Sequence, residues 1–232
     1  MAYVISFYLW CVGAVFFLFF LLTALLLSYC FPLRKIDPFL KTILRFFFKA
    51  LFIEVKVSGA EGIKPDQPYL FMVNHVSFLD IPLIGGFVPG FIRGIEAARQ
   101  HKWPLYGTVM GRLGNIPIER GSIHSSISSM EKAVHYLSQE NSLVIFPEGG
   151  RTLDGNMKSF KKLPFHLAKK AGVDIIPIAI SGMYALNNKN AYMMRPGTVH
   201  LNFGTPISKE VVKETETLEL RNMVKSAIQD LI

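Results

Sequence analysis

The chain has little cysteine and little charge for its length. Its 232 residues include two cysteines, Cys11 and Cys30, and only 18% are charged, against about 25% in an average soluble chain. If the segment between the cysteines is helical, their Cα atoms lie ~28 Å apart, far beyond the ~7 Å that a disulfide allows. We therefore expect no disulfide and no cysteine-based metal site, as in a domain that faces the reducing cytoplasm.

Other signatures are also missing from the sequence. It has no internal repeat, low-complexity tract or interior linker, so the length predicts one domain with a sizeable core. It has no Gly-x-Ser-x-Gly nucleophile elbow. The net charge of +8 fits anionic lipids, an acidic protein or a phosphate-bearing substrate. Nucleic acid is not expected as a partner, because no stacking-aromatic or recognition-helix pattern accompanies the charge.

The N-terminus is a long apolar segment, with no charged side chain between Ala2 and Pro32. A membrane-spanning helix needs ~20 such residues, so residues 1–33 predict a transmembrane or leaflet-inserted helix. A signal peptide and a buried soluble helix are the alternatives, and the length of the segment disfavours both. The first charges are Arg34 and Lys35, which by the positive-inside rule predict that the rest of the chain faces the cytoplasm.

Residues 34–54 predict a basic amphipathic helix. Lys41, Arg45 and Lys49 repeat every four residues and share one helical stripe, while aromatic and aliphatic side chains cover most of the rest. Such a helix directly after a membrane segment suits the membrane interface; the alternative is an ordinary helix packed on the domain. The two segments could also form a helical hairpin dipped into one leaflet, a choice that the sequence leaves open.

From residue 55 to residue 232 short apolar runs alternate with helical stretches. This alternation predicts an α/β layered domain with a largely parallel or mixed sheet flanked by helices. The expected strands are residues 53–59, 68–74, 91–96, 115–120, 142–149, 174–181 and 198–204. One expected helix begins near Ser77, and the others cover residues 102–114, 125–139, 163–172 and 217–232. Gly172 is the expected C-terminal cap of its helix.

The stretch Asn74–Pro82, which reads NHVSFLDIP, follows one of the buried strands. In one interpretation Ser77 and Asp80 simply begin a helix as a capping box. In the other, His75 lies in the loop before the helix and folds back, so that Asp80 holds one imidazole nitrogen and leaves the other to take a proton. On a regular helix the two side chains would point ~140° apart. Open α/β sheets place their sites at the carboxyl ends of strands, which fits the second interpretation.

Two further stretches end strands with candidate anion-binding groups. Arg120 follows a short strand in GNIPIERGS, Gly114–Ser122, and Arg151 follows paired glycines in VIFPEGGRT, Val144–Thr152. Glycines let backbone amides approach a ligand, and the planar guanidinium suits phosphate. Taken alone, each stretch is equally compatible with a polar turn and a surface arginine.

The blocks NHVSFLD, GNIPIER, FPEGGRT and IIPIAI resemble, in sequence and order, the four signature blocks of the phospholipid/glycerol acyltransferase family. The best-known members of that family are the 1-acyl-sn-glycerol-3-phosphate acyltransferases, and the resemblance covers about residues 56–207. It implies transfer of a fatty acyl group from a thioester to the sn-2 hydroxyl of 1-acylglycerol-3-phosphate, which makes phosphatidic acid. It also implies a glycerol-3-phosphate acyltransferase-like fold, a membrane enzyme and an acyl-CoA or acyl carrier protein donor, with no cofactor and no metal.

The same resemblance implies roles for individual residues. His75 matches the general base, Asp80 the acid that orients it, and Arg120 the phosphate-binding arginine of the second block. The third block, which binds the acceptor, supplies Glu148, Gly149, Gly150 and Arg151. Gly150 stands where the family commonly has Thr or Ser. Pro177 falls in the fourth block, which we interpret as a plain buried strand.

One departure from the family pattern concerns the acceptor. Ala97, in the run Glu96–Ala98, stands where members that use lysophosphatidic acid usually carry a lysine. Either Arg93, Arg99 or Lys102 compensates for the missing cation, or the acceptor is another lysophospholipid or a lyso-aminolipid. A non-catalytic membrane lipid-binding protein and a membrane-bound hydrolase are the alternatives from other functional classes.

Overall fold

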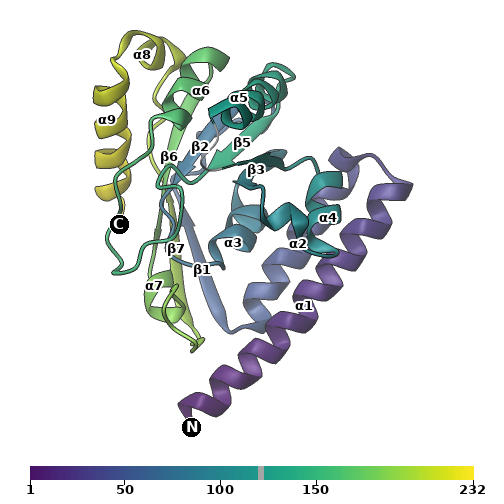
Figure 1. Cartoon of the computed structure of the whole chain (residues 1–232). Coiled ribbons are helices and arrows are strands. Elements are labelled where there is room, and N and C mark those ends of the chain that lie inside the picture. Colours follow the sequence, from purple (N-terminus) through teal and green to yellow (C-terminus); the bar gives the residue numbers. More distant parts are fainter. Residues whose placement is uncertain (120–122) are drawn as a thin grey trace.

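The computed structural model describes residues 1–119 and 123–232, the stretch 123–127 by its backbone only. Within these residues seven strands form one sheet in the order β1-β7-β6-β2-β5-β3-β4, shown with its helices in Figure 1. The strands are β1 (Ile53–Ser58), β2 (Tyr69–Val73), β3 (Ile92–Ala97), β4 (Ile116–Ile118), β5 (Ser142–Ile145), β6 (Asp174–Ser181) and β7 (Gly197–Phe203). Neighbouring strands are parallel except β6 and β7. The predicted largely parallel, mixed sheet is therefore confirmed.

Helices connect most of the strands, as the alternating sequence predicts. After the N-terminal hairpin they are α3 (Asp80–Phe87), α4 (Tyr106–Arg112), α5 (Ile123–Ser138), α6 (Leu163–Ala171), α7 (Met183–Leu186), α8 (Lys209–Glu214) and α9 (Thr217–Gln229). Gly172 ends α6 with φ 64° and ψ 42°, which confirms the predicted glycine cap. The sequence did not predict α7 and α8, because helices of 4 and 6 residues show too little periodicity.

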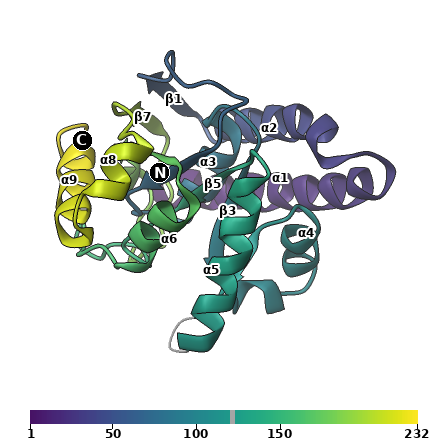
Figure 2. The ribbon, with the colours of Figure 1, turned by 90° about the horizontal axis from the view of Figure 1, so that it is seen from above.

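The central strands are buried on both faces because helices cover both sides of the sheet. All five residues of β2 are buried, and their side chains alternate between two clusters. Phe71 and Val73 pack with α3 and the N-terminal helices, whereas Leu70 and Met72 pack with α5 and α6. Figure 2 shows the hairpin and α5 on different sides of the strands.

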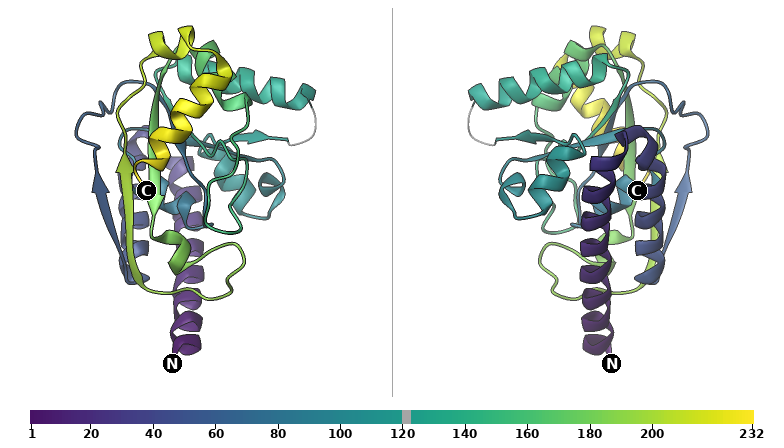
Figure 3. Two further views of the ribbon diagram at one scale, coloured as in Figure 1. Left: turned by 90° about the vertical axis from the view of Figure 1, so that its left-hand side faces the viewer. Right: turned by 90° about the vertical axis from the view of Figure 1, so that its right-hand side faces the viewer.

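The two N-terminal helices, α1 (Ala2–Cys30) and α2 (Leu33–Ala50), form an antiparallel hairpin. By length and composition α1 qualifies to cross a membrane, and its outward side chains are large and apolar, such as Tyr3, Phe7 and Leu18. Its N-terminal end projects beyond the rest of the molecule in Figure 3. The apolar segment of residues 1–33 and the amphipathic segment of residues 34–54 are therefore packed against each other.

α1 also touches the domain along most of its length. Leu9 belongs to the buried cluster of the sheet, and Phe17 stacks on Tyr106 of α4. Near the C-terminal end, the guanidinium of Arg112 donates to the hydroxyl and carbonyl oxygens of Ser28. From Leu9 to Ser28 these contacts cover about 28 Å of the helix axis.

The basic stripe of α2 is divided between the protein and its surface, because Lys41 is half-buried whereas Arg45 and Lys49 are exposed. Lys41 Nζ donates to the carbonyl oxygens of Val88 (2.7 Å) and Gly90, and Arg45 Nε donates to that of Gly86 (2.8 Å). These carbonyls lie at the C-terminal end of α3, where unpaired acceptors carry partial negative charge. Burial lowers the pKa of Lys41. The stripe therefore packs in part on the domain, and the role of α2 at the membrane interface stays a prediction.

Candidate active site

The predicted pair of His75 and Asp80 is formed at the carboxyl end of β2. The helix begins at Asp80, so His75 lies in the preceding loop and folds back over the first turn. His75 Nδ1 is 2.8 Å from Asp80 Oδ2, and the carboxylate is fully buried whereas the histidine side chain is 14% exposed. An ionised carboxylate only accepts hydrogen bonds, so Nδ1 carries the proton. Nε2 has no hydrogen-bond partner in the described part of the chain, and its lone pair can accept a proton.

Asp80 also has the structural role that the capping interpretation assigns to it. Its Oδ2 atom accepts the backbone N–H groups of Val76 (2.7 Å) and Ser77 (2.8 Å), which is the return bond of a capping box. Ser77 Oγ in turn accepts the N–H of Leu79. The bonds that the capping interpretation expects are formed in the turn before α3, whose N-cap is Leu79 and not Ser77, and they place the carboxylate beside His75.

Phe146 fixes the plane of the imidazole. The rings of His75 and Phe146 are stacked, with centroids 4.0 Å apart and an angle of 19° between the planes. Phe146 follows β5, which lies next to β2 in the sheet. The stack and the Nδ1 bond together leave the base little rotational freedom. The sequence analysis did not identify Phe146, because it ends an apolar run that predicts only a strand.

Glu148 connects the third motif to the first. Its Oε1 atom accepts the backbone N–H of His75 (2.8 Å), and its Oε2 atom accepts that of Lys158 (2.9 Å). The side chain is buried, and burial raises the pKa of Glu148, although the two N–H bonds oppose the rise. Both oxygens are engaged, so the geometry favours a positioning role over the direct acceptor contact that the family resemblance implies.

Arg151 lies next to His75, because the N–H of Thr152 donates to the His75 carbonyl over 2.8 Å. Gly149 has φ +71°, in the left-handed region that glycine adopts without strain. Among the described residues, the N–H groups of Gly150 and Arg151 have no acceptor and the Arg151 guanidinium has no partner. The loop therefore presents two amides and one fixed positive charge near the base.

Lys158 orients this loop from its other side. Its Nζ atom donates to the carbonyl oxygens of Gly150 (3.3 Å) and Arg151 (2.5 Å). A trans peptide points its C=O and N–H in opposite directions, so the N–H groups of Arg151 and Thr152 point away from Lys158. The N–H of Thr152 reaches the His75 carbonyl, and the N–H of Arg151 also points away from Lys158.

Two buried asparagines brace the catalytic loop. Asn74 exchanges two hydrogen bonds with the backbone of Ile180 in β6, at 2.9 and 2.7 Å. Asn187 Oδ1 accepts the hydroxyl of Ser77 at 2.9 Å. The sequence analysis did not identify Asn187, because it lies 110 positions from Ser77 and no local pattern links them.

The predicted second anion-binding residue, Arg120, lies outside the described residues, and its phosphate contact stays a prediction. Arg93 does not compensate for the missing lysine, because its guanidinium is buried and pairs with Asp37 over 2.9 Å. The sheet register places Arg93 beside Leu143 near the start of β5, far from the carboxyl edge where His75 lies. The expectation that Arg93 replaces the missing lysine is therefore wrong.

Where a lysine is expected, the chain has a small apolar residue, Ala97, and beside it a glutamate, Glu96, whose carboxylate already has hydrogen-bond partners. Ala97 is buried. Glu96 beside it accepts the hydroxyl of Tyr106 (2.7 Å) and the amide of Asn115, which ties β3 to α4. Arg99 and Lys102 are exposed and stay candidates for compensation.

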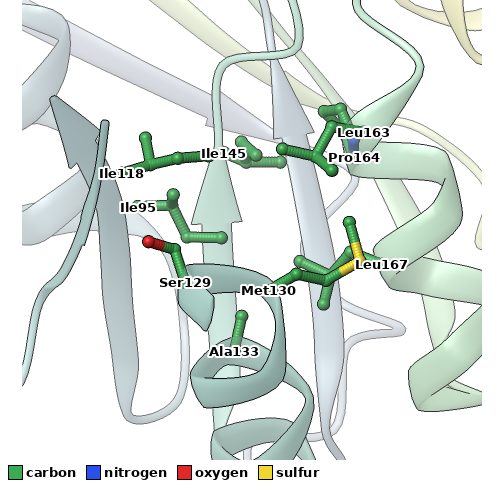
Figure 4. Close-up of a pocket in the computed structure, with 9 residues that line it drawn as sticks. All are labelled: Ile95, Ile118, Ser129, Met130, Ala133, Ile145, Leu163, Pro164 and Leu167. Carbon is green, nitrogen blue, oxygen red and sulfur yellow. The ribbon is translucent and has the colours of Figure 1, made fainter. Parts of the chain in front are cut away.

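A small apolar hollow of about 10 Å³ lies on the α5 and α6 face of the sheet, as Figure 4 shows. It is lined by Ile95, Ile118, Ser129, Met130, Ala133, Ile145, Leu163, Pro164 and Leu167. The hydroxyl of Ser129 donates to the carbonyl of Pro117. Ile145 lines the hollow, whereas the next residue, Phe146, stacks on His75. The sheet therefore separates the hollow from the imidazole.

The arrangement can remove a proton from a hydroxyl group and hold an anion beside it. Residues 1–119 and 123–232 contain no group of three His, Cys, Asp or Glu side chains that could hold a metal ion. The site combines a histidine base whose imidazole is held in place, a buried carboxylate, and a loop with a cation and free backbone amides.

Comparisons with known proteins find similarity over most of the chain. Residues 54–181 match the family model described as Acyltransferase. A crystal structure of the 1-acyl-sn-glycerophosphate (LPA) acyltransferase PlsC from Thermotoga maritima superposes with a TM-score of 0.83 at 26% identity, covering 99% of this chain and 93% of that one.

The names of the curated relatives differ in their acceptor. The 1-acyl-sn-glycerol-3-phosphate acyltransferase of Limnanthes douglasii is 29% identical over 68% of this chain and 56% of its own length. A lyso-ornithine lipid O-acyltransferase of Pseudomonas aeruginosa is 37% identical over 57% of this chain and 49% of its own length. The chain spans about half the length of the curated relatives that it matches.

Proposed function

This chain belongs to the acyltransferase family, and we propose that it transfers a fatty acyl group from an acyl thioester to the sn-2 hydroxyl of 1-acylglycerol-3-phosphate, making phosphatidic acid. The observation that carries the proposal is the 2.8 Å contact between His75 Nδ1 and Asp80 Oδ2, with the Arg151 loop beside it. A base next to a cationic loop suits an acceptor that carries both a hydroxyl and a phosphate. The names of the relatives from Limnanthes and Thermotoga support the same acceptor.

The proposed reaction needs a base but no enzyme nucleophile. His75 Nε2 takes the hydroxyl proton as the alcohol oxygen attacks the thioester carbonyl carbon, and Asp80 stabilises the imidazolium that forms. The tetrahedral intermediate then collapses, the C–S bond breaks, and the imidazolium returns its proton to the leaving thiolate. A direct transfer agrees with a sequence that has neither a Gly-x-Ser-x-Gly motif nor a cysteine outside α1.

The third-motif loop supplies charge stabilisation in this proposal. The N–H of Arg151, next to the residue that bonds the His75 carbonyl, is the candidate donor to the oxyanion of the tetrahedral intermediate. The Arg151 guanidinium binds the acceptor phosphate and thereby orients the hydroxyl toward Nε2. Glu148 and Lys158 act on this loop and on the His75 backbone, so their role is positioning. The scheme uses two substrates and no bound cofactor.

We propose further that the α1–α2 hairpin inserts into one leaflet, with the catalytic domain on the cytoplasmic side. The domain contacts along α1 cover about 28 Å, close to the ~30 Å of a hydrocarbon core. A helix that crossed the bilayer along its normal would draw these domain surfaces into the hydrocarbon, whereas a hairpin lying obliquely in one leaflet would not. Arg34 and Lys35 after α1 favour the cytoplasmic side. The acceptor then stays in the membrane, and acyl-CoA or acyl carrier protein delivers the donor from water.

A lyso-aminolipid acceptor is the second candidate. It is favoured by Ala97, which stands where a lysine is expected, and by the similarity to the lyso-ornithine lipid acyltransferase. The chemistry at His75 is the same for either acceptor, and only the group that Arg151 must bind differs.

A transfer assay with a panel of lysolipids tests both candidates. Detergent-solubilised protein receives a radiolabelled acyl thioester with lysophosphatidic acid, lysophosphatidylethanolamine or lyso-ornithine lipid, and His75→Ala runs in parallel. We expect label in phosphatidic acid and its loss in the variant. Label only in the aminolipid, still lost in the variant, selects the second candidate. Full-rate transfer by His75→Ala would overturn the mechanism for both.

A further inference from the structure

We infer that the loop between α7 and β7, residues 187–196, is a second bilayer contact, with Tyr192 as its interfacial anchor. The inference rests on the proposed insertion of the α1–α2 hairpin. With this loop, the membrane-contacting face of the protein includes a part of the catalytic domain that lies far from the apolar N-terminus in sequence.

Tyr192 is unusually exposed for a large aromatic residue. Its side chain is 94% exposed, and it lies between Lys189 and Arg195, both in the same loop. Tyrosine is enriched at the membrane–water boundary. Lysine and arginine can lay their aliphatic stems along apolar surface and place the charge among anionic head groups. This composition fits a lipid interface better than bulk water.

The loop is fastened to the N-terminal half of α1. Trp10 Nε1 donates to the carbonyl of Tyr192 over 2.8 Å, and the N–H of Met194 donates to Ser6 Oγ over 2.9 Å. Met194 is buried in the same cluster as Leu9. Figure 3 shows this loop beside the lower part of α1. Tyr192 therefore belongs to a loop that lies next to a helix whose exposed side chains are largely apolar.

Several backbone groups of the loop have hydrogen-bond partners, which lowers the cost of placing it near the head-group region. The N–H of Ala191 donates to the carbonyl of Asn188, and that of Arg195 donates to the carbonyl of Leu186. The N–H of Asn190 donates to the side chain of Asn188. An irregular loop with these internal bonds can approach the head-group region at low cost in unpaired polar groups.

The same elements touch the catalytic loop. Trp10 stacks on Phe78 with ring centroids 5.4 Å apart and planes 20° apart, and Phe78 lies between the catalytic pair in sequence. Asn187, the first residue of the loop, accepts the Ser77 hydroxyl and donates to the carbonyl of Met193. A bilayer contact at Tyr192 would therefore seat the active site against the surface from which the acceptor arrives.

Spin labels on the full-length protein test the contact directly. Cys11 and Cys30 are replaced by alanine, and a nitroxide is attached to one of Tyr192→Cys, Leu18→Cys or Lys170→Cys. Leu18 reports the outward face of α1, and Lys170 reports an exposed position on α6. Each labelled protein is reconstituted with phosphatidylcholine and phosphatidylglycerol vesicles, and its collisions with oxygen and with a water-soluble nickel chelate are measured.

We expect the label at 192 to favour oxygen over the nickel chelate, as the label at 18 does and the label at 170 does not. A label at 192 that matches 170, while 18 meets lipid, overturns the loop contact and leaves the hairpin insertion standing. A label at 18 that matches 170 overturns the insertion itself, and the loop contact with it.

An activity comparison separates anchoring from folding. Tyr192→Ser should lower the transfer rate several-fold when the acceptor is presented in those vesicles, and should leave it unchanged when the acceptor is dispersed in detergent micelles. Lys170→Ser is the matched control and should change neither rate. An equal loss in vesicles and micelles would contradict the anchoring role.

Discussion

The backbone N–H of His75 donates to Glu148 Oε1 over 2.8 Å, which joins two motifs that lie 73 positions apart in the sequence. A second bond runs between the same two loops, from the N–H of Thr152 to the carbonyl of His75. Both backbone polar groups of the base are therefore held by the third motif. The position of the base depends on a carboxylate that does not itself touch the imidazole in these contacts.

Removal of the base should leave a folded but nearly inactive protein. We expect His75→Ala to lower kcat by about 10²–10⁴, the usual contribution of a general base. Asp80→Asn can keep an oxygen at the Oδ2 position and with it the N–H bonds of Val76 and Ser77. It lacks the charge that stabilises the imidazolium, so kcat should fall by up to about 10⁴. Thermal unfolding of both variants in detergent checks that the loss is chemical, and a midpoint far below wild type would point to misfolding instead.

Glu148 should make the stability depend on pH in a direction unusual for a carboxylate. Burial raises the pKa of Glu148 above its ordinary 4.5, so the folded protein keeps a proton that the unfolded chain has already released. The free energy of unfolding therefore falls as the pH rises from about 4.5 through the folded pKa, and below that window the group is neutral in both states. Glu148→Gln does not titrate, so its melting temperature should decline less over this range.

The control for Glu148 is the difference between the two unfolding series, measured in one detergent from about pH 4 to about pH 8. Other titrating groups contribute equally to both proteins and cancel in the difference. A wild-type curve parallel to that of Glu148→Gln would mean that the folded pKa is not raised.

Much of the fold was readable from the sequence, because each buried strand leaves a short apolar run bounded by turn residues. YLFMV, SLVI and DIIPIAIS became β2, β5 and β6. The orientation of α2 was not readable. A four-residue repeat shows that Lys41 and Arg45 share a stripe, but it does not show that the carbonyl end of α3 lies opposite them.

Some residues of the candidate site could be predicted from the sequence and others could not. Strand ends and residue types marked His75, Asp80 and Arg151 as candidates, and the resemblance to the acyltransferase family assigned their roles. Phe146 and Lys158 were not, since their roles come from tertiary contacts: a stack on an imidazole and a bridge to two carbonyls. Phe146 ends an apolar run and Lys158 lies in a polar loop, and most residues in such surroundings neither stack on an imidazole nor bond two carbonyls.

Lys158 should prove to be a positioning residue with an effect on kcat. Lys158→Met removes the ammonium that holds the carbonyls of Gly150 and Arg151, so the peptide groups of this loop are no longer held in place. We expect kcat to fall about 10-fold or more, with the KM for the donor little changed, because one hydrogen bond to a charged group is worth about 1.5–3 kcal/mol. Lys158→Arg should restore part of the rate, since it keeps the charge. An equal loss in both variants would indicate a packing defect.

Arg151 should affect the acceptor and not the donor. Arg151→Ala removes the guanidinium that is proposed to bind the phosphate, so the KM for lysophosphatidic acid should rise by about 10-fold or more, as expected for a charge-assisted contact. Arg151→Lys keeps the charge but not the bidentate geometry, so its KM for lysophosphatidic acid should lie between those of the wild type and Arg151→Ala. Steady-state kinetics with each substrate varied in turn checks the split. A rise confined to the donor KM would move Arg151 to the thioester side of the site.

Trp10 should matter for catalysis although it lies in the N-terminal helix. Its ring stacks on Phe78 and its indole N–H holds the carbonyl of Tyr192, so Trp10→Ala frees the catalytic loop on one side. Aromatic pairs contribute about 0.5–1.5 kcal/mol beyond their burial, which predicts a several-fold loss of kcat. Trp10→Phe keeps the stack but not the hydrogen bond and should retain more activity. Leu18→Ala, on the outward face of the same helix, is the matched control. If Leu18→Ala loses as much activity as Trp10→Ala in detergent, the helix acts only as an anchor and the contact with Phe78 is incidental.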